Sequence, residues 1–329
     1  MRADLFRQSA FAATLSANPI VYVDIGSRGG FETDLLPWAF GTEAIGFEPA
    51  PEEFARLQHQ VAGPWKSRTF LPHAVSGASG KRRLHIPEDP IGASLLPADE
   101  AAMAPFDKAH LFDPKTVLDV DTLTLPDALA AGNLPMPDYL KIDVEGAEHE
   151  ILSAAPEILS RLCVLKIEVA FLPMRQGHPL ADELTGKLRR VGLQLFDLIE
   201  PAHWRDRGNI IHPLADGDLP IRYSRGQIVH GDFVFFRTVE AMDFTTPDGR
   251  MQAYKTALLA MSFGYFDYAA RILAAPRMGD FLADAGIHDA PAEIAKLSAA
   301  YGRLAFRQAF CRHLRMMMTF MRRCAQAFR

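Results

Sequence analysis

The chain has 329 residues, 49% of them hydrophobic, and a formal net charge of −5. This length and apolar content predict roughly two domains with a large core. The acidic balance lacks the positive field that phosphate binding needs, so no nucleic-acid partner is expected. The three cysteines form no C-x-x-C pair, which gives no support to a zinc ribbon or a disulfide framework and favours a cytoplasmic location.

Residues 1–19 carry spaced apolar side chains that Arg7, Gln8 and Ser9 interrupt. A signal peptide needs an unbroken apolar segment, which this stretch lacks. No run of about 18 apolar residues occurs elsewhere, so no membrane span is expected. We predict an N-terminal lead-in helix that packs against the domain following it.

From residue 20 to residue 240, predicted strands alternate with predicted helices. The strands cover residues 20–24, 44–48, 68–75, 81–86, 116–123, 138–143, 162–170, 192–199 and 232–237. The helices cover residues 31–40, 51–61, 125–131, 147–159 and 180–190. This alternation predicts an α/β fold with a mostly parallel, doubly wound sheet. The strand over 116–123 is predicted at an edge, and the last two strands are predicted to pair antiparallel around a polar insertion.

The composition changes near residue 240. Helical patterns cover residues 247–275 around Gly264, and a further helix begins near Ala292. We therefore divide the chain into the lead-in segment 1–19, an α/β domain over 20–240 and an all-α accessory domain over 241–329.

Residues 303–329 hold seven arginines and no acidic residue. Apolar residues recur there at heptad spacing, at Phe310, Leu314, Met317, Met321, Cys324 and Phe328. The pattern predicts a basic amphipathic helix that contacts either a partner helix or an anionic surface. It is also compatible with a homo-oligomer.

A glycine-rich loop follows the first predicted strand, in the pattern Asp24-x-Gly26-x-x-x-Gly30. The dinucleotide pattern G-x-G-x-x-G is absent, and an acid at this place would repel a pyrophosphate. It suits instead a ligand that carries an ammonium and a sulfonium. Glu48 ends the next strand, where a carboxylate can accept both hydroxyls of a ribose. Each acid has an alternative role, because Asp24 can cap the glycine turn and Glu48 can cap the helix that follows Pro51.

A third acid turn lies in the segment Tyr139-Leu-Lys-Ile-Asp-Val-Glu-Gly-Ala-Glu-His-Glu150. Apolar residues lead into Asp143, and Glu145 and a glycine follow. A buried strand thereby delivers Asp143 to the carboxyl edge of the sheet, where open α/β folds bind ligands. Acid-ended strands that flank a glycine loop favour S-adenosylmethionine as the cofactor.

These motifs resemble the FkbM family of S-adenosylmethionine-dependent methyltransferases. The matching segments are Val23-Asp-Ile-Gly-Ser-Arg-Gly-Gly30, Gly46-Phe-Glu-Pro49, Ala74-Val-Ser-Gly77 and Leu140-Lys-Ile-Asp-Val-Glu-Gly-Ala-Glu148. The resemblance covers roughly residues 18–238 and implies a class I, Rossmann-like methyltransferase fold with an antiparallel last strand. It also implies O-methylation of a hydroxyl, usually on a sugar of a glycan or a glycosylated metabolite.

The resemblance further implies a set of cofactor contacts. The predicted cofactor residues are Asp24, Gly26, Ser27, Gly30, Glu48, Pro49, His73, Ala74 and Asp143. Asp24 and the glycines would surround the methionine part, Glu48 the ribose, and His73 with Ala74 the adenine. Family members commonly carry Ala-Asn at positions 27–28, so Arg28 either shifts the loop or meets an acidic substrate.

An alcohol acceptor must lose its proton at or near the transition state. We predict Asp143 as the general base, since its strand ends beside the transferring methyl group in this fold. Its alternative role is to cap the following helix. Glu145 is a second catalytic candidate, or else it orients the turn through backbone N–H groups. His178 can reach a substrate hydroxyl from the loop 173–179, although an ordinary exposed loop histidine has the same sequence context.

Asp143 and Glu168 end adjacent strands and are a candidate pair of Mg²⁺ ligands, but we expect no metal.

We therefore interpret the chain as an S-adenosylmethionine-dependent O-methyltransferase of FkbM type. An alternative is a methyltransferase-like scaffold without turnover that acts as a protein-interaction module through its helical tail. A nicotinamide-dependent oxidoreductase is disfavoured by the missing glycine pattern. The loops 87–114 and 171–179 would build the acceptor pocket, and their composition leaves the acceptor unspecified.

Overall fold

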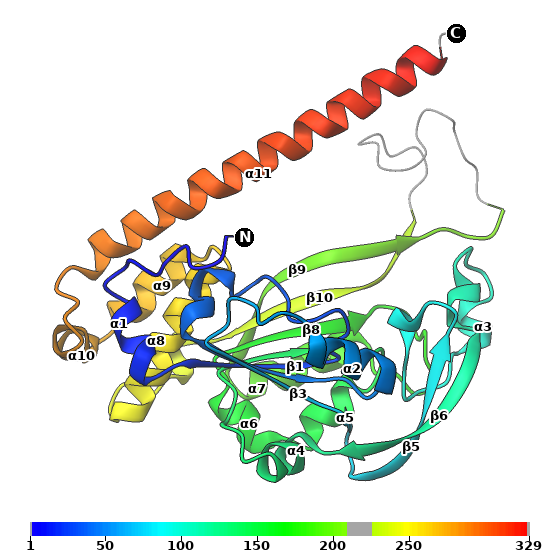
Figure 1. Cartoon of the computed structure of the whole chain (residues 1–329), viewed down its shortest axis with the longest axis horizontal. Coiled ribbons are helices and arrows are strands. Elements are labelled where there is room, and N and C mark those ends of the chain that lie inside the picture. The colour runs from blue at the N-terminus through cyan, green and yellow to red at the C-terminus, as the bar shows by residue number, and fades with distance from the viewer. Residues whose placement is uncertain (1, 209–225, 328–329) are drawn as a thin grey trace.

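The computed structural model describes residues 2–208 and 226–327. Its centre is a seven-stranded sheet with the order β3-β2-β1-β7-β8-β10-β9 (Figure 1). The strands are β1 Ile20–Ile25, β2 Thr42–Phe47, β3 Ser67–Leu71, β7 Tyr139–Ile142, β8 Val164–Ala170, β9 Leu193–Trp204 and β10 Gln227–Arg237.

All neighbouring strands of this sheet run parallel except the two pairs that involve β10. The predicted mostly parallel sheet with an antiparallel final pair is therefore confirmed. Its strand order is consistent with a Rossmann-like methyltransferase. Most of the predicted polar insertion between β9 and β10 lies outside the described residues.

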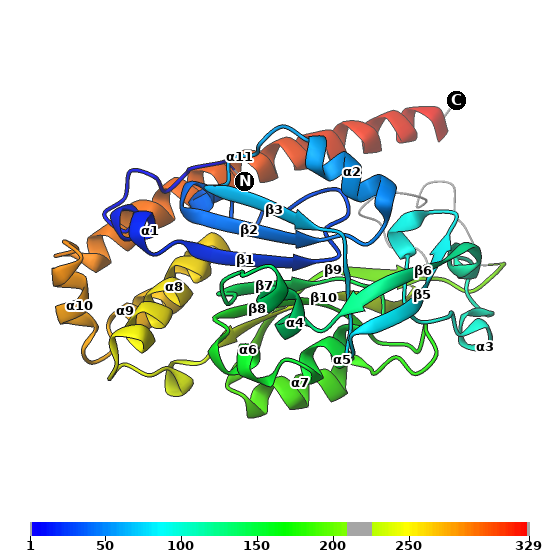
Figure 2. The ribbon, with the colours of Figure 1, turned by 60° about the horizontal axis from the view of Figure 1, so that its bottom comes forward.

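A three-stranded sheet lies near the carboxyl ends of β1 to β3 (Figure 2). Its order is β4-β6-β5, with β4 Ala74–Val75, β5 Gly80–Pro87 and β6 Pro114–Leu123. Two predictions are wrong here. The single strand expected over 68–75 is divided between two sheets, because Pro72 has no N–H to donate to a ladder. The strand over 116–123 is central, since β6 pairs with both β4 and β5.

Three predicted helices are present with nearly the expected bounds, α2 Pro51–His59, α4 Leu125–Ala131 and α7 Ala181–Arg190. The helix predicted over 31–40 is wrong, because only the short 3₁₀ helix η1 (Leu36–Gly41) forms. The residues before it cross the sheet face instead, where Glu32 and Asp34 both pair with Lys166 of β8. The helix predicted over 147–159 is two helices, α5 Glu148–Ser153 and α6 Pro156–Arg161, since Pro156 interrupts the backbone hydrogen bonding.

The predicted surface loop over 87–114 contains short helical turns, η2 Pro90–Gly92, α3 Glu100–Met103 and η3 Ala109–Phe112. Its apolar side chains Met103, Phe106 and Phe112 are buried in a small cluster with Trp204 of β9. This segment therefore packs against one end of the strands β8, β9 and β10.

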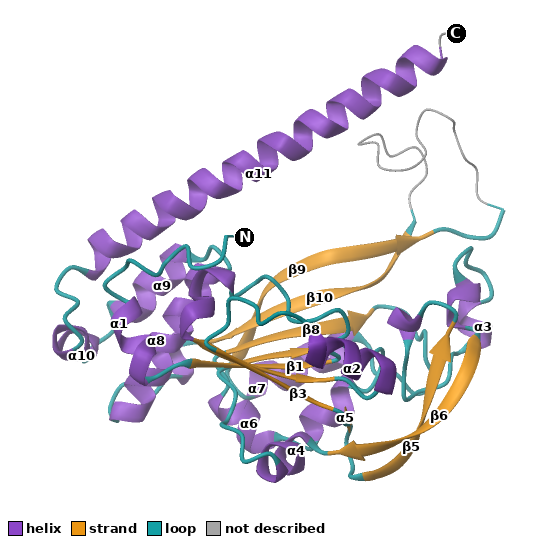
Figure 3. Cartoon of the chain, viewed as in Figure 1, coloured by secondary structure: helices purple, strands orange, loops and turns teal. Residues whose placement is uncertain are grey.

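Helices from both ends of the chain cover one face of the sheet. In the N-terminal segment the only helix among the described residues is α1 (Ala12–Ala17), which is shorter than predicted. The helices α8 Pro247–Ser262, α9 Phe266–Leu273 and α10 Met278–Asp284 pack beside it (Figure 3). Trp38 Nε1 donates to the Leu258 carbonyl at 2.8 Å, and the Tyr254 hydroxyl donates to the Phe11 carbonyl at 2.8 Å. The sheet and the C-terminal helices thus share one hydrophobic core, while α4 to α7 cover the opposite face.

The last helix, α11 (Ala290–Ala327), begins on this helical cluster and extends past the body of the protein (Figure 1). Ile294 and Leu297 are buried at its start, and Tyr301 packs edge-on against Phe266. In the described part of the chain, no helix is long and apolar enough to cross a membrane.

Candidate active site

A cavity of about 280 Å³ opens at the carboxyl ends of β1, β2 and β7. Seven of the predicted cofactor residues line it: Gly26, Gly30, Glu48, Pro49, His73, Ala74 and Asp143. Apolar side chains of the segment after β4, including Leu84, Ile91 and Leu95, form another wall. The three acid turns therefore meet at one edge of the sheet, where parallel strands place their carboxyl ends together.

Gly26 lets the first turn pass close to β7. Its φ is +88°, and a Cβ built on it would lie 1.9 Å from the Asp143 carbonyl oxygen. Any larger residue would force the ends of β1 and β7 apart. This glycine thus serves a close approach of two backbones at the cavity wall.

Asp24 and Ser27 lie behind the cavity and do not line it. Both are fully buried, and the Ser27 hydroxyl donates to the Asp24 carbonyl at 2.8 Å. Neither carboxylate oxygen of Asp24 accepts a hydrogen bond among the described residues. Burial raises the pKa of Asp24 to about 7, although the nearby Lys141 opposes the shift.

Lys141 is the cation at the centre of the site. Its Nζ lies 3.5 Å from Asp24 Oδ1, 3.4 Å from Glu32 Oε1 and 3.3 Å from Asp143 Oδ2. Burial opposes its charge, but these three carboxylates together raise the pKa of Lys141 above its usual range. Lys141 therefore stays protonated and cannot serve as a general base.

The sequence contains a signal for Lys141 that the motif reasoning did not use. Residues two apart in a strand point to the same face, so Lys141 and Asp143 share a face with β1 Asp24. A charged residue inside the buried strand β7 requires an ionic partner on that face. Lys166 occupies the same kind of place in β8, where it pairs with Glu32, Asp34 and Asp232.

Glu48 lies at the end of β2 and is 4% exposed. Its Oε1 accepts a hydrogen bond from the Ala50 N–H at 2.8 Å, and Arg28 Nη2 lies 3.9 Å from the same oxygen. Burial raises the pKa of Glu48, while the Ala50 N–H and Arg28 act in the opposite direction. A carboxylate has acceptor positions for about four hydrogen bonds, so capacity remains for ligand hydroxyls.

The turn after Asp143 is held by Glu148 rather than by Glu145. Glu148 Oε1 accepts from the N–H groups of Val144 and Gly146, both at 3.1 Å. Glu145 has a positive φ of 59°, and its carboxylate lies 3.4 Å from Arg175 Nη2. Burial raises the pKa of Glu145 to about 7 although Arg175 opposes the shift. Glu145 does not line the cavity.

His178 is buried beneath the same turn and is not an exposed loop histidine. Its Nε2 lies 3.6 Å from Glu148 Oε2, and its side chain is only 7% exposed. Burial, with a smaller contribution from Arg175, lowers the pKa of His178 to about 4, so the ring is neutral near pH 7. His178 lines a small pocket together with Glu148 and Glu168, and it does not line the cavity beside Asp143.

Asp143, Glu145 and Glu168 are the described residues that could hold a metal ion, with one oxygen of each within 4.8 Å of the others. Oxygen ligands of this kind suit Mg²⁺. All three already have partners, because Lys141 Nζ lies 3.3 Å from Asp143 Oδ2, Arg175 lies beside Glu145 and His230 Nδ1 lies 2.9 Å from Glu168 Oε1.

Replacing Glu148 with glutamine is expected to reduce the pH dependence of stability. Burial raises the pKa of Glu148 from an ordinary 4.5 to about 7, so the folded protein binds this proton more tightly than the unfolded chain. Its contribution to the free energy of unfolding is therefore present at low pH and is lost, by about 2–3 kcal/mol, as the pH rises through 7. Denaturant titrations at pH 5 and pH 8 would measure this. The free energy of unfolding of Glu148→Gln should change less between the two pH values than that of the wild type, whereas the exposed control Glu157→Gln should change as much as the wild type. Equal changes in all three proteins would refute the raised pKa of Glu148.

The model of the methyltransferase FkbM domain matches residues 24–195, just over half of the chain. The chain belongs to the FkbM methyltransferase family. The match begins at Asp24, includes all three acid turns and ends within β9, so the helices after residue 241 lie outside it. No curated protein matches this methyltransferase.

Proposed function

We propose that this methyltransferase uses S-adenosylmethionine to methylate a hydroxyl group, on a sugar of a glycan or of a glycosylated metabolite. The observation that carries the proposal is the cavity on which the ends of β1, β2 and β7 converge, with Glu48 and Asp143 in its wall and Asp24 behind it. The sugar acceptor is an expectation from the family resemblance, and the charge and shape of the cavity support the cofactor.

The charges around the cavity favour a cationic ligand. Glu32, Glu48 and Asp143 line it, and the positive charge of Lys141 is already shared among three carboxylates. Arg28 is the remaining cation of the wall and lies beside Glu48. Such a site would repel the pyrophosphate of a nicotinamide cofactor and attract an ammonium and a sulfonium.

The residues present fit the cofactor. Gly26 and Gly30 line the cavity and add no side chain to its wall. Among the described residues, the buried oxygens of Asp24 accept no hydrogen bond, and Glu48 has capacity for two ribose hydroxyls. Ala74 with the apolar side chains Leu84 and Leu95 offers a surface for the adenine ring. When bound, the cofactor would supply a methyl group on an electrophilic sulfonium.

In the proposed reaction, Asp143 takes the proton of the acceptor hydroxyl while the acceptor oxygen forms its bond to the methyl carbon and the carbon–sulfur bond breaks. The Asp143 side chain is 40% exposed, and its Oδ2 lies 3.3 Å from Lys141. Lys141 therefore orients this carboxylate at the cavity, and positioning of the acceptor supplies much of the remaining rate enhancement. The proposal needs no metal, because Arg175 and His230 already neighbour the other two acids of the cluster.

Replacing Glu48 with alanine is expected to weaken S-adenosylmethionine binding by about 10–100-fold, because hydrogen bonds to a charged acceptor are lost. Glu43→Ala is the matched control, since Glu43 lies at the opposite end of the same strand and its one ion pair among the described residues is with the partly exposed Lys66. Isothermal titration calorimetry measures both. An absence of binding by the wild-type protein, for the cofactor and for its demethylated product, would refute the proposed cofactor.

The non-catalytic alternative is distinguished by turnover. Mass spectrometry of glycans from cells with and without the gene should reveal one methyl group that depends on this protein. Binding of S-adenosylmethionine without transfer to any acceptor would instead favour a scaffold that acts through its helices.

A further inference from the structure

The outer part of α11 has an apolar face that no described residue of the body covers. From residue 303 onwards most side chains of the helix are exposed, including Phe306 at 70% and Phe310 at 59%. Leu314, Met317 and Met321 continue this exposed row. Their spacing of three or four residues places them on one side of the helix, since an α-helix has 3.6 residues per turn. The result is a continuous apolar face of aromatic, leucine and methionine side chains.

The same part of the helix is strongly cationic. Residues 303–329 contain seven arginines and no acid, whereas the whole chain has a net charge of −5. The acidic excess therefore lies in the rest of the protein. Of the described α11 arginines, none has a carboxylate of the described residues within ion-pair distance.

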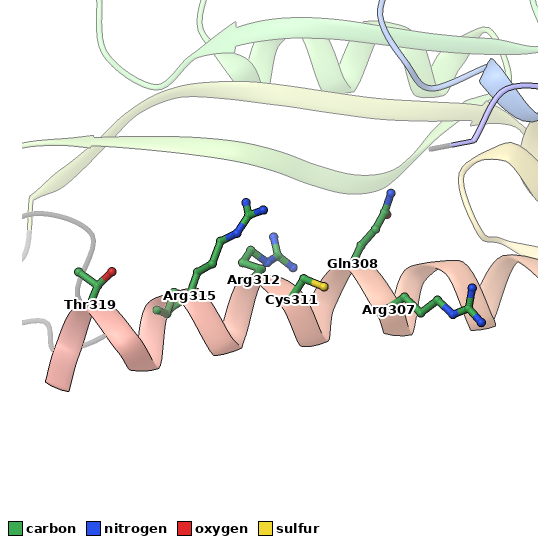
Figure 4. A pocket seen from close by; sticks show the side chains of 7 residues that line it. Arg307, Gln308, Cys311, Arg312, Arg315 and Thr319 are labelled. Atoms are coloured by element: carbon green, nitrogen blue, oxygen red, sulfur yellow. The ribbon is translucent and has the colours of Figure 1, made fainter. Parts of the chain in front are cut away.

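The described residues of the body do not neutralise these arginines from the other side of the helix. Arg312 and Arg315 point toward the strands of the sheet across an open hollow of about 580 Å³ (Figure 4). Every residue that lines this hollow belongs to α11 itself. Both the apolar face and the arginines are thus available to a partner outside the chain.

We propose that the exposed part of α11 docks on an anionic lipid surface. The helix would lie in the plane of the interface, with its apolar face at the acyl boundary and its arginines at the phosphates, as cationic amphipathic helices do. The acidic body would be repelled by the same surface, so the charge asymmetry would also orient the protein. The proposal is independent of the proposed cofactor and reaction.

A second copy of the chain is a poorer occupant. Paired α11 helices would bring arginines together without any acid to match them, and like charges beside a helical seam are destabilising. The exposed apolar face is also wider than a two-residue heptad seam, because Phe306 and Met318 extend it. Both properties match a lipid interface better than a helical dimer.

Flotation of the full-length protein with vesicles tests the proposal. Vesicles of phosphatidylcholine and phosphatidylserine should carry the protein upward, and vesicles of phosphatidylcholine alone should carry much less. The double variant Arg315→Ala/Arg322→Ala is expected to lower the affinity for the anionic vesicles by about 30-fold. The matched control Arg189→Ala/Arg190→Ala removes the same charge from exposed positions of α7 and should bind as the wild type does.

The apolar face is tested by Phe310→Ser/Met317→Ser, which should also lose flotation while circular dichroism remains that of a folded protein. Equal binding to neutral and anionic vesicles would overturn the proposal. So would an absence of binding, or an equal loss in the α7 control. A dimer in light scattering that the two α11 variants dissociate, without vesicle binding, would assign the face to a second copy instead.

Discussion

Replacement of Asp143 with asparagine is expected to lower kcat by about 10²–10⁴-fold, the usual contribution of a positioned general base. Asparagine keeps the shape of the side chain but cannot accept the acceptor's proton. Cofactor affinity should change far less than kcat, because Asp143 occupies only part of the cavity wall. Steady-state turnover and calorimetric titration of the same preparation would separate the two effects.

Glu168→Gln is the matched control for this prediction, since Glu168 lies in the adjacent strand β8 and belongs to the same acidic cluster. In the proposed metal-free reaction, Glu168→Gln keeps most of its turnover. Loss of turnover in both variants, with recovery on addition of Mg²⁺, would instead indicate that the cluster holds a metal. Unchanged turnover of Asp143→Asn would remove Asp143 as the base and leave the methyltransferase family membership unaffected.

Replacement of Lys141 with methionine is expected to reduce the free energy of unfolding by about 3–5 kcal/mol, because a buried charge network loses its cation. Asp24 and Asp143 would then lose their cation, while Glu32 would keep only Lys166. Chemical denaturation monitored by circular dichroism measures the effect. Lys66→Met is the control, since Lys66 is partly exposed and pairs with one carboxylate, and its cost should stay below about 1 kcal/mol.

A double variant tests whether charge is the cause of this loss. Adding Asp24→Asn to Lys141→Met removes one of the uncompensated acids and should recover part of the lost stability. Two results speak against the network: a cost for Lys141→Met no larger than that for Lys66→Met, or additive costs in the double variant.

Local patterns in the sequence were sufficient to locate the three strand ends that form the wall of the candidate active site. Short apolar runs that end in Asp24, Glu48 and Asp143 predict buried parallel strands, and parallel strands bring their carboxyl ends to one edge. Seven of the nine predicted cofactor residues accordingly line one cavity. The cofactor itself, the base and the acceptor stay predictions that the proposed experiments address.

Other features depended on residues far apart in the sequence. The first helix of the expected fold is missing because Glu32 and Asp34 bind Lys166, more than 130 residues away. His178 has no local signal for burial, and only the tertiary packing of its loop buries the ring, which, with a smaller contribution from Arg175, lowers its pKa. Periodicity reports which face of an element is apolar but not which partner covers it.

The sequence by itself thus determined most of the strands and helices and the three acid turns, because these follow from local periodicity, and it determined the family, because the family's motifs are local. Tertiary structure alone decided that Lys141 joins the acids of β1 and β7 and that helices from both ends of the chain complete one core. It also decided that α11 leaves that core with its apolar face uncovered. The physical reason is that desolvation and charge pairing depend on three-dimensional neighbours, which sequence spacing does not specify.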